Sequence, residues 1–377
     1  MHHLQLKESG RPAGNRCVMP TNSATQFWLK TKRRLTDVRG IMERRRFQVL
    51  RNRFYDTLWR DAATTVDAEA MSLPNGIMQI KRGSLATFVK QSDIMLDNAV
   101  ASRLLLNKAL TYQWLSAKGL RTPRSVEFDL DTIHLAEKFL LGQPGPVVVK
   151  PADGTGCGHG VTTQIATRTA LHDAATHAAA FHPHLLVEEQ LQGSSFRLLF
   201  LDGVFIDAVR RDPPTLTGNG KSSIRQLARE ENDRRREGSE LTALSPLIID
   251  RECCNTLSMA GLTPASVLPE GECIGVKLAV NENAARENHV VRDEVHSEIL
   301  DTCSRIARDF GIGFAGFDIM SNDISQPAEI GDTIFTEINT GPGIHHHRLV
   351  GEPEKAAPIA SIILEHLFAA RRGVFEL

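Results

Sequence analysis

Three oxygen-bearing side chains on two predicted strands have the types and spacing to hold a hard metal cation. Asp318 lies in the middle of the apolar run FAGFDIM (314–320), where a lone carboxylate is costly to bury without a partner. Glu337 and Asn339 lie two residues apart in DTIFTEIN (332–339), so a strand would point them to the same face. A few carboxylates that leave positions for water and phosphate oxygens suit Mg²⁺. The alternative is an exposed strand whose acids face solvent.

A second set of residues has the composition of a phosphate-binding loop. Lys150 follows the apolar core of PVVVKP (146–151), and the glycine-rich stretch DGTGCGHG (153–160) comes next. Glycines let backbone N–H groups approach a phosphate closely, and a lysine adds a point charge. The stretch is not a Walker A loop, because it has no G-K-[ST]. It is not a dinucleotide-binding fingerprint either, because VTTQI (161–165) predicts a returning strand. An ordinary flexible turn is the alternative.

Two adjacent acids stand at the end of the predicted strand 185–189, in the segment EEQLQG (188–193). Glu188 and Glu189 are placed to accept hydrogen bonds from an adenine amino group or from ribose hydroxyls. The backbone of Leu191 could read the adenine edge. A polar loop is the alternative.

The histidine run 345–347 invites a zinc interpretation that its spacing disfavours, because three consecutive side chains cannot all reach one ion from a regular helix or strand. The six cysteines include no C-x-x-C pair, and the adjacent pair 253–254 does not suit a simple zinc site. Cys157 is either a thiol activated by nearby N–H groups or a small residue that the loop tolerates. Such sparse cysteines favour a reduced, cytoplasmic environment.

Hydrophobic periodicity and turn residues predict the elements that would position these groups. We expect helices over 26–70, 101–119, 131–141, 169–181, 222–237, 293–309 and 353–371. We expect strands over 146–151, 161–165, 185–189, 196–201, 204–210, 247–250, 274–280, 314–320 and 332–339, with short strands and turns over 71–100. Asp202-Gly203 between two of these strands is a hairpin signal.

Charge is unevenly distributed along the 377 residues. Residues 1–60 hold 14 Lys and Arg against 4 Asp and Glu, net +10, whereas the remainder is net −11. Five arginines line the predicted first helix, namely Arg44, Arg45, Arg46, Arg51 and Arg53. We interpret them as a solvated basic face. Contact with an anionic partner or a neighbouring subunit is the alternative, and nucleic acid ranks third because no aromatic residues are interleaved.

The ends of the chain and its apolar segments give no sign of a membrane anchor. Residues 1–23 are polar and contain glycine and proline, so we expect a disordered tail. They lack the apolar segment of a secretory signal, and a transit peptide is the alternative. Met19 is an alternative start. No run of 18 apolar residues is present to span a membrane.

Taken in chain order, these motifs resemble the ATP-grasp superfamily. Within it, the chain looks most like the ligase domain of cyanophycin synthetases and of bifunctional glutathione synthetases. The resemblance extends over 101–350. It rests on NKALTYQWLSAKGLRTP (107–123), VVVKPADGTGCGHGV (147–161), VEEQLQG (187–193), AVRRDPPTLTGNGKSSI (208–224), DEVH (293–296), GFAGFDIMSNDISQP (313–327) and EINTGPGIHHH (337–347).

The resemblance implies an α+β fold of the ATP-grasp type. An N-terminal α/β domain (24–100) would follow the tail, then a small central lobe (101–187) and a larger C-terminal lobe with a mixed sheet (188–377). The nucleotide would lie between the two lobes.

The resemblance also implies an ATP-dependent carboxylate–amine ligase that works through an acyl phosphate and releases ADP and phosphate. Its substrates would be amino acids or peptides. A phosphotransferase that stops after transfer to a hydroxyl is one alternative, and a nucleotide-binding protein without turnover is another. We expect small-molecule partners and self-association as a dimer or tetramer, but neither membrane nor nucleic acid.

Roles for single residues follow from the same resemblance. The nucleotide would be held by Lys108, Lys150, Asp153, Gly154, Gly156, Gly158, Gly160, Glu188, Glu189 and Leu191. Two Mg²⁺ ions, with Mn²⁺ as the alternative, would be held by Asp318, Glu337 and Asn339. Arg210 and Lys150 would be catalytic, and Arg210 would stabilise the transferring phosphate. The substrate side would include Arg197, His296, Gly343 and His347. Ser195 stands where many relatives have an acid for the ribose, and NENAAREN (281–288) replaces a glycine-containing segment.

Overall fold

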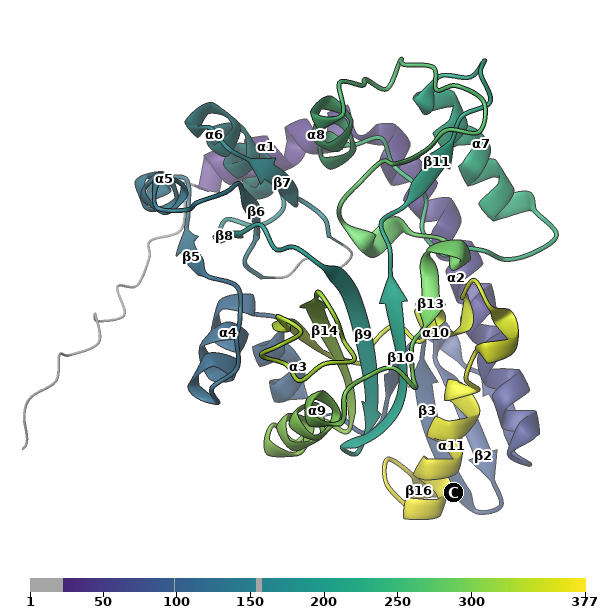
Figure 1. The fold of residues 1–377 in the computed structure, drawn as a ribbon. Coiled ribbons are helices and arrows are strands. Elements are labelled where there is room, and N and C mark those ends of the chain that lie inside the picture. Colours follow the sequence, from purple (N-terminus) through teal and green to yellow (C-terminus); the bar gives the residue numbers. More distant parts are fainter. Residues whose placement is uncertain (1–22, 98, 154–157) are drawn as a thin grey trace, which may run out of the picture.

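The structure is a computed structural model that describes residues 23–97, 99–153 and 158–377 (Figure 1). The α-helices are α1 (Ser23–Thr36), α2 (Val38–Thr65), α3 (Ala99–Leu105), α4 (Lys108–Ala117), α5 (Ile133–Leu141), α6 (Arg168–Ala179), α7 (Ile224–Glu237), α8 (Arg251–Met259), α9 (Ser297–Asp309), α10 (His345–Arg348) and α11 (Ile359–Ala370). Short 3₁₀ turns are η1 (Pro74–Gly76), η2 (Val280–Glu282), η3 (Ala285–Glu287) and η4 (Pro353–Lys355).

The strands pair antiparallel throughout the described part of the chain, where a mixed sheet was expected for the larger lobe. They are β1 (Glu69–Ser72), β2 (Met78–Arg82), β3 (Leu85–Lys90), β4 (Asp93–Ile94), β5 (Ser125–Phe128), β6 (Val147–Pro151), β7 (Thr162–Ile165), β8 (Leu185–Glu189), β9 (Ser194–Leu201), β10 (Val204–Arg211), β11 (Thr215–Thr217), β12 (Cys273–Gly275), β13 (Asn288–Val290), β14 (Phe314–Ser321), β15 (Ile334–Thr340) and β16 (Phe375–Glu376).

The smaller lobe is a four-stranded sheet in the order β5-β8-β6-β7, with α5 and α6 packed on it (Figure 1). The apolar residues of β6 are buried, as a strand covered by helices requires. Alanines on α6 allow that helix to lie close to the sheet. The hairpin β6–β7 confirms the predicted returning strand, so the glycine-rich stretch connects two paired strands.

The larger lobe is a five-stranded sheet in the order β13-β10-β9-β14-β15. Side chains alternate along β9, so Phe196 and Leu198 face the core with α9, whereas Ser195 and Arg197 face the opposite side. The predicted turn between β9 and β10 is confirmed, because Asp202 and Gly203 have φ values of 48° and 74°, which a two-residue hairpin of this hand needs.

The third sheet joins both ends of the described chain. Its order is β1-β2-β3-β16, with β4 pairing with β3, so the last strand lies beside residues from the first hundred. Helices α2 and α11 pack on each other and share one core with this sheet. The C-terminal helix and strand thus complete the N-terminal unit.

Several predicted helices are shorter or divided. The stretch 26–70 forms two helices separated at Asp37, followed by β1, because residues 69–72 pair with β2. The stretch 101–119 divides at Asn107, whose side chain caps α4. The C-terminal helix starts at Ile359, not 353. The predicted tail lies outside the described residues, apart from Ser23, which begins α1.

The predicted strand 247–250 is wrong. Its backbone groups bond to distant side chains instead of a neighbouring strand: Leu247 N donates to Asn232 Oδ1 at 2.7 Å, and Ile248 N donates to Glu282 Oε2 at 2.8 Å. The unpredicted helix α8 follows, with Asp250 as its cap. The predicted strand 274–280 is also wrong beyond Gly275, where β12 ends.

Candidate functional site

Most of the residues predicted for the site line one cavity of about 500 Å³ between the four-stranded and five-stranded sheets. The predicted residues in its wall are Lys108, Lys150, Gly158, Glu188, Glu189, Leu191, Arg197, Asp318, Glu337, Asn339 and Gly343. We call this space the catalytic cavity. Sequence reasoning assigned no nucleotide, metal or catalytic role to four other residues of its wall, which are Arg51, Arg211, His345 and His346.

Three charged side chains form one row across adjacent strands of the five-stranded sheet. Asp318 on β14 lies directly opposite both Arg197 on β9 and Glu337 on β15. Arg197 Nε donates to Asp318 Oδ1 at 2.6 Å, and Arg211 Nη2 lies 3.3 Å from Asp318 Oδ2. Burial alone would raise the pKa of Asp318, but the charges of Arg197 and Arg211 hold it below its usual value. Asp318 is therefore ionised at neutral pH.

Asn339 supplies the observation that tests whether a metal fits here. Its side chain lines the catalytic cavity on the same strand as Glu337, and its amide nitrogen is buried without a hydrogen-bond partner in the described structure. The amide can equally present its oxygen, which is an acceptor for a cation. Two carboxylates and one amide oxygen match the donor preferences of Mg²⁺, so these residues fit a hard divalent cation.

Lys108 reaches the catalytic cavity from the first turn of α4. The Asn107 side chain accepts a hydrogen bond from Leu110 N at 3.0 Å, which caps the helix and fixes the direction of this turn. Lys108 Nζ lies 3.1 Å from Glu337 Oε1. Burial would lower the pKa of Lys108, but Glu337 outweighs it and the pKa is raised. The ammonium of Lys108 therefore stays charged beside Glu337 and Asp318.

Lys150, Glu188 and Tyr112 form a buried triangle. Lys150 Nζ lies 2.6 Å from Glu188 Oε1 and 3.2 Å from the Tyr112 hydroxyl, which donates to Glu188 Oε2 at 3.1 Å. Burial and then the charge of Glu188 raise the pKa of Tyr112 well above its usual value, so the phenol keeps its proton. Sequence reasoning missed Tyr112, although it lies one helical turn after Lys108 and so on the same face of α4.

Glu189, the second of the two adjacent acids, pairs with Arg124 instead of Lys150. Arg124, just before β5, donates through its backbone N and its guanidinium to Glu189, with Nε at 2.8 Å from Oε2. The two acids therefore have different surroundings, although they are adjacent in sequence. Gln190 and Leu191 continue the wall of the catalytic cavity beyond them.

The glycine-rich stretch is described in part. Gly154, Gly156 and Cys157 lie outside the described residues. Gly158 and Gly160 have φ values of 67° and 81°, which L-residues with a side chain rarely adopt. A Cβ on Gly158 would lie 2.1 Å from the Asn281 side chain. Asp153 does not line the catalytic cavity.

Of the two adjacent arginines at the end of β10, the structure places Arg211 in the wall of the catalytic cavity. Arg211 pairs across the sheet with Ser195, and its side chain is 4% exposed. Burial lowers the pKa of Arg211 to about 10, against the opposing effect of Asp318. Arg210, the predicted catalytic residue, does not line the catalytic cavity, although its Nε is 3.0 Å from Oδ1 of Asp212, which does.

The histidines predicted for the substrate side are placed away from the catalytic cavity. His296 is the N-cap residue of α9, where its ring accepts from Glu298 N. His347 is buried, and its Nδ1 lies 2.8 Å from Asp207 Oδ2. Burial lowers the pKa of His347, although Asp207 opposes the shift. His345 and His346 line the catalytic cavity instead, next to Gly343.

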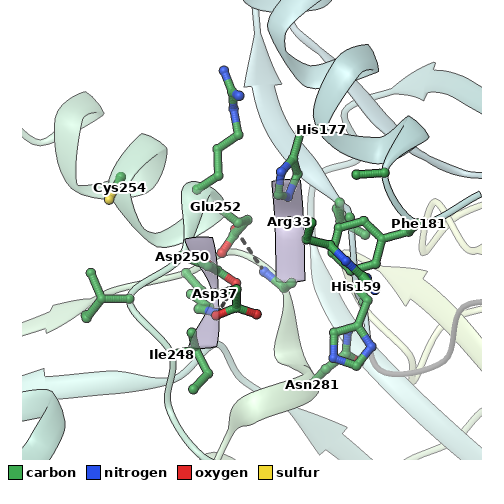
Figure 2. Close-up of a pocket in the computed structure, with 18 of the residues that line it drawn as sticks. Arg33, Asp37, His159, His177, Phe181, Ile248, Asp250, Glu252, Cys254 and Asn281 are labelled. Carbon is green, nitrogen blue, oxygen red and sulfur yellow. Dashed lines mark hydrogen bonds and ion pairs between the residues drawn. The ribbon is translucent and has the colours of Figure 1, made fainter. Parts of the chain in front are cut away.

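A second cavity of about 540 Å³ adjoins the catalytic cavity (Figure 2). Both are lined by Gly158, Val161, Ala279 and Asn281. Figure 2 shows Asp37, Asp250 and Glu252 grouped on one side of this space, and His177, Phe181 and His159 on the other.

Glu252 is the most unusual acid of this second cavity. Its Oε1 accepts from Leu278 N at 2.7 Å, whereas its Oε2 is buried without a partner among the described atoms. Burial raises the pKa of Glu252 to about 7, although the charge of Lys277 opposes it. Burial therefore moves the titration of Glu252 from the acidic range toward neutral pH.

Residues 23–97, 99–153 and 158–377 contain no group of three His, Cys, Asp or Glu side chains arranged to hold a metal ion. The set Asp318, Glu337 and Asn339 differs from such a group because its third donor is an amide. No helix in the described part of the chain is long and apolar enough to cross a membrane.

Comparison with known proteins gives relatives in sequence and in structure, although no family model matches the chain. A cyanophycin synthetase from Trichormus variabilis is 28% identical over 328 residues, covering 82% of this chain and 36% of the relative. The bifunctional glutathione biosynthesis protein of Listeria innocua is 26% identical over 318 residues, covering 82% of this chain and 40% of the relative. The chain thus spans about two-fifths or less of the length of these relatives.

Among solved structures, a bifunctional glutathione synthetase from Pasteurella multocida superposes with a TM-score of 0.50 at 21% identity, covering 80% of this chain and 41% of that one. The sequence relatives bear the two names that the motifs suggested, and this structure shares the fold. The predicted resemblance and the predicted α+β fold are confirmed.

Proposed function

We propose that this chain, an ATP-grasp protein by sequence and fold, is an ATP-dependent carboxylate–amine ligase. The observation that carries the proposal is the arrangement of the catalytic cavity. Lys108 and Lys150 enter from the smaller lobe and its preceding helix, and face Asp318, Glu337 and Asn339 on the larger sheet. Cations and hard-cation ligands around one cavity are what a nucleoside triphosphate with its metal requires.

In this proposal each side chain has a task in holding phosphate or the developing charge. Lys108 and Lys150 contact the phosphates of ATP, with Lys150 oriented by Glu188 and the Tyr112 hydroxyl. Arg211, rather than Arg210, stabilises the transferring phosphoryl group, because it lies in the cavity wall beside Asp318. The strand exit 190–191 is the candidate for the adenine contact.

Asp318, Glu337 and Asn339 would hold Mg²⁺, with a second Mg²⁺ or Mn²⁺ in the same donor set. Bound there, the ion would neutralise charge on the phosphate oxygens and so favour attack at the γ-phosphorus. Lys108 and Arg197 pair with these carboxylates in the structure and must share them with the ion.

The reaction takes two steps in which the protein positions the reactants. A carboxylate oxygen of the first substrate attacks the γ-phosphorus, the bond to the β–γ bridging oxygen breaks, and ADP leaves. The amine of the second substrate then attacks the carbonyl carbon of the acyl phosphate. Phosphate departs with the C–O electron pair, and the amine loses one proton as the amide forms. Amino acids or peptides are the proposed substrates.

A screen with hydroxylamine tests this proposal directly. The chain is incubated with MgATP, hydroxylamine and each of the 20 amino acids or a dipeptide library, and both ADP and hydroxamate are measured. Hydroxylamine intercepts an acyl phosphate, so a ligase gives the two products in equal amounts. ADP with a stable phosphorylated product and no hydroxamate would identify a phosphotransferase. Saturable ATP binding with no ADP from any compound would contradict the ligase assignment.

A further inference from the structure

Arg51 lies in the wall of the catalytic cavity although it belongs to the N-terminal helix α2. It follows Phe47 by four residues and precedes Tyr55 by four, so the three side chains share one face of the helix. Phe47 and Tyr55 are 2% and 3% exposed, which shows that this face points into the protein. Arg45 and Arg53 are exposed. The basic face predicted from the sequence thus has one member in the wall of the catalytic cavity, Arg51, and another in the wall of the second cavity, Arg44.

The ion pairs of the catalytic cavity leave Arg51 without an acid. The four other Lys and Arg side chains in the wall of the catalytic cavity pair with carboxylates: Lys108 with Glu337, Lys150 with Glu188, and both Arg197 and Arg211 with Asp318. Arg51 has no carboxylate within 4 Å among the residues that the structure describes, and its hydrogen bond there is a long one, 3.4 Å from Nη2 to Ser245 Oγ. A guanidinium in the wall of a cavity without a counter-charge is a binding group for an anion.

The neighbours of Arg51 fix its position and reinforce its charge. The Tyr55 hydroxyl lies 3.0 Å from His345 Nδ1 and 2.8 Å from Ser92 Oγ, which ties α2 to the start of α10 and to the turn between β3 and β4. Burial and then the charge of Arg51 hold the pKa of His345 well below its usual value. His346, also in the cavity wall, has a lowered pKa because of burial. Both imidazoles are therefore neutral at pH 7 and offer hydrogen bonds without cancelling an anionic ligand.

We propose that Arg51 binds a substrate carboxylate that does not react, and so makes α2 part of the substrate site. This inference rests on the proposed ligase function and adds a class of substrate to it: an amino acid or peptide with a carboxylate besides any that is activated. The planar guanidinium suits a carboxylate, which it can bind with two parallel hydrogen bonds. The phosphates of ATP already have Lys108, Lys150 and Arg211. The carboxylate belongs either to the amine substrate or to an acyl donor with two carboxylates.

The test compares carboxylates with their neutral carboxamides in the full-length chain. The probes are the 20 L-amino acids and their α-carboxamides, measured by ADP release with MgATP and by thermal shift with a non-hydrolysable ATP analogue. The variants are Arg51→Met, Arg51→Lys and, as a matched control on the same helix, Arg45→Met. We expect the wild type to favour at least one carboxylate over its carboxamide. Arg51→Met should reduce that preference by roughly ten-fold or more, because a hydrogen bond to a charged group is lost.

The remaining readouts separate this inference from its alternatives. The KM for ATP should stay within about two-fold in Arg51→Met, Arg51→Lys should retain part of the preference, and Arg45→Met should match the wild type. If the hydroxylamine assay shows the loss, the carboxylate belongs to the acyl donor; if only the complete amine reaction shows it, it belongs to the amine substrate. A wild type without any preference, or an Arg51→Met variant with the preference intact, overturns the proposal. The thermal-shift measurement tests the carboxylate preference even if no compound gives ADP. Absence of ADP release would count against the ligase function alone.

Discussion

Arg197 and Asp318 face each other directly across β9 and β14, with Arg197 Nε 2.6 Å from Asp318 Oδ1. The pair is buried, since the two side chains are 11% and 10% exposed. Arg211 approaches the same carboxylate from β10. One carboxylate thus pairs with two buried guanidinium groups, so Asp318 contributes to folding as well as to the proposed metal site.

This double role predicts that Asp318→Asn lowers stability. In protein without Mg²⁺ or nucleotide, the substitution removes the carboxylate that two buried guanidinium groups share, which we expect to reduce the free energy of unfolding by about 3 kcal/mol. Glu337→Gln is the matched control, because Glu337 is 29% exposed and its partner is a single lysine. We expect that variant to unfold within about 1 kcal/mol of wild type. Urea unfolding of the three proteins measures this, and equal losses for both variants would contradict the assignment.

Glu337→Gln should have a large effect on catalysis although its effect on stability is small. Glu337→Gln removes a carboxylate at the point where phosphate charge accumulates, so its kcat should fall by roughly 100-fold or more in saturating Mg²⁺ while the fold is retained. Circular dichroism and the urea curve serve as the controls for folding. ADP formation near the wild-type rate would remove Glu337 from the mechanism.

The adjacent arginines of β10 give a second matched comparison. Arg211→Met removes a guanidinium from the cavity wall, and we expect a loss of roughly 10² in kcat, typical of a lost charge-stabilising donor. Arg210→Met removes a partly exposed side chain that pairs with Asp212 but does not itself line the catalytic cavity, so its kcat should stay within a few-fold of wild type. Steady-state kinetics at saturating ATP decide between them. A greater loss for Arg210→Met would restore the role that the sequence suggested.

The difference between Arg210 and Arg211 shows where sequence reasoning stops. Local patterns were sufficient for β6, β8 and the β9–β10 hairpin, because apolar runs and the turn residues Asp202-Gly203 act over a few residues. Which of two neighbouring arginines faces the cavity depends on register. The ladder between β9 and β10 shifts between Phe205 and Asp207, so simple alternation from the hairpin does not carry through to its end.

Long-range contacts account for further differences between the predictions and the structure. The strand predicted over 247–250 fails because Asn232 and Glu282, both distant in sequence, satisfy its backbone. In the sequence, Arg51 is one basic residue among several, and only the packing of α2 beside His345 of α10 distinguishes it. Periodicity shows which residues share a face of a helix, but not what that face meets.

Tyr112→Phe should weaken nucleotide binding moderately. The hydroxyl holds Lys150 and Glu188 in one arrangement, so its loss frees the lysine without removing its charge. We expect the Kd for ATP to rise a few-fold, in line with about 1 kcal/mol for one hydrogen bond, and Lys150→Met to raise it far more. Calorimetric titration with a non-hydrolysable ATP analogue measures both. An unchanged Kd in Tyr112→Phe would show that Glu188 orients the lysine alone.

Glu252 predicts a pH dependence of stability that runs opposite to that of most paired acids. Its pKa is about 7 in the folded chain against 4.5 for an ordinary glutamate, because the carboxyl group is buried. Between these values the folded state keeps the proton and the unfolded state has lost it, so stability falls as pH rises from about 4.5 to about 7 and then levels off. The full loss is roughly 3 kcal/mol, since one pKa unit corresponds to about 1.4 kcal/mol. Glu252→Gln keeps the shape without the charge and should therefore gain stability relative to wild type across this window.

Urea unfolding at pH 5, 6, 7 and 8 follows that difference between Glu252→Gln and wild type. The exposed Glu240 provides the control, because Glu240→Gln should leave the pH profile of the wild type unchanged. A constant difference between Glu252→Gln and wild type at all four pH values would mean that Glu252 does not titrate in this range. A difference that shrinks as pH rises would reverse the sign and contradict the burial of its charge as the cause. A ligand of the second cavity that brings a cation to Oε2 should abolish the dependence, because an ionised Glu252 would then have a partner.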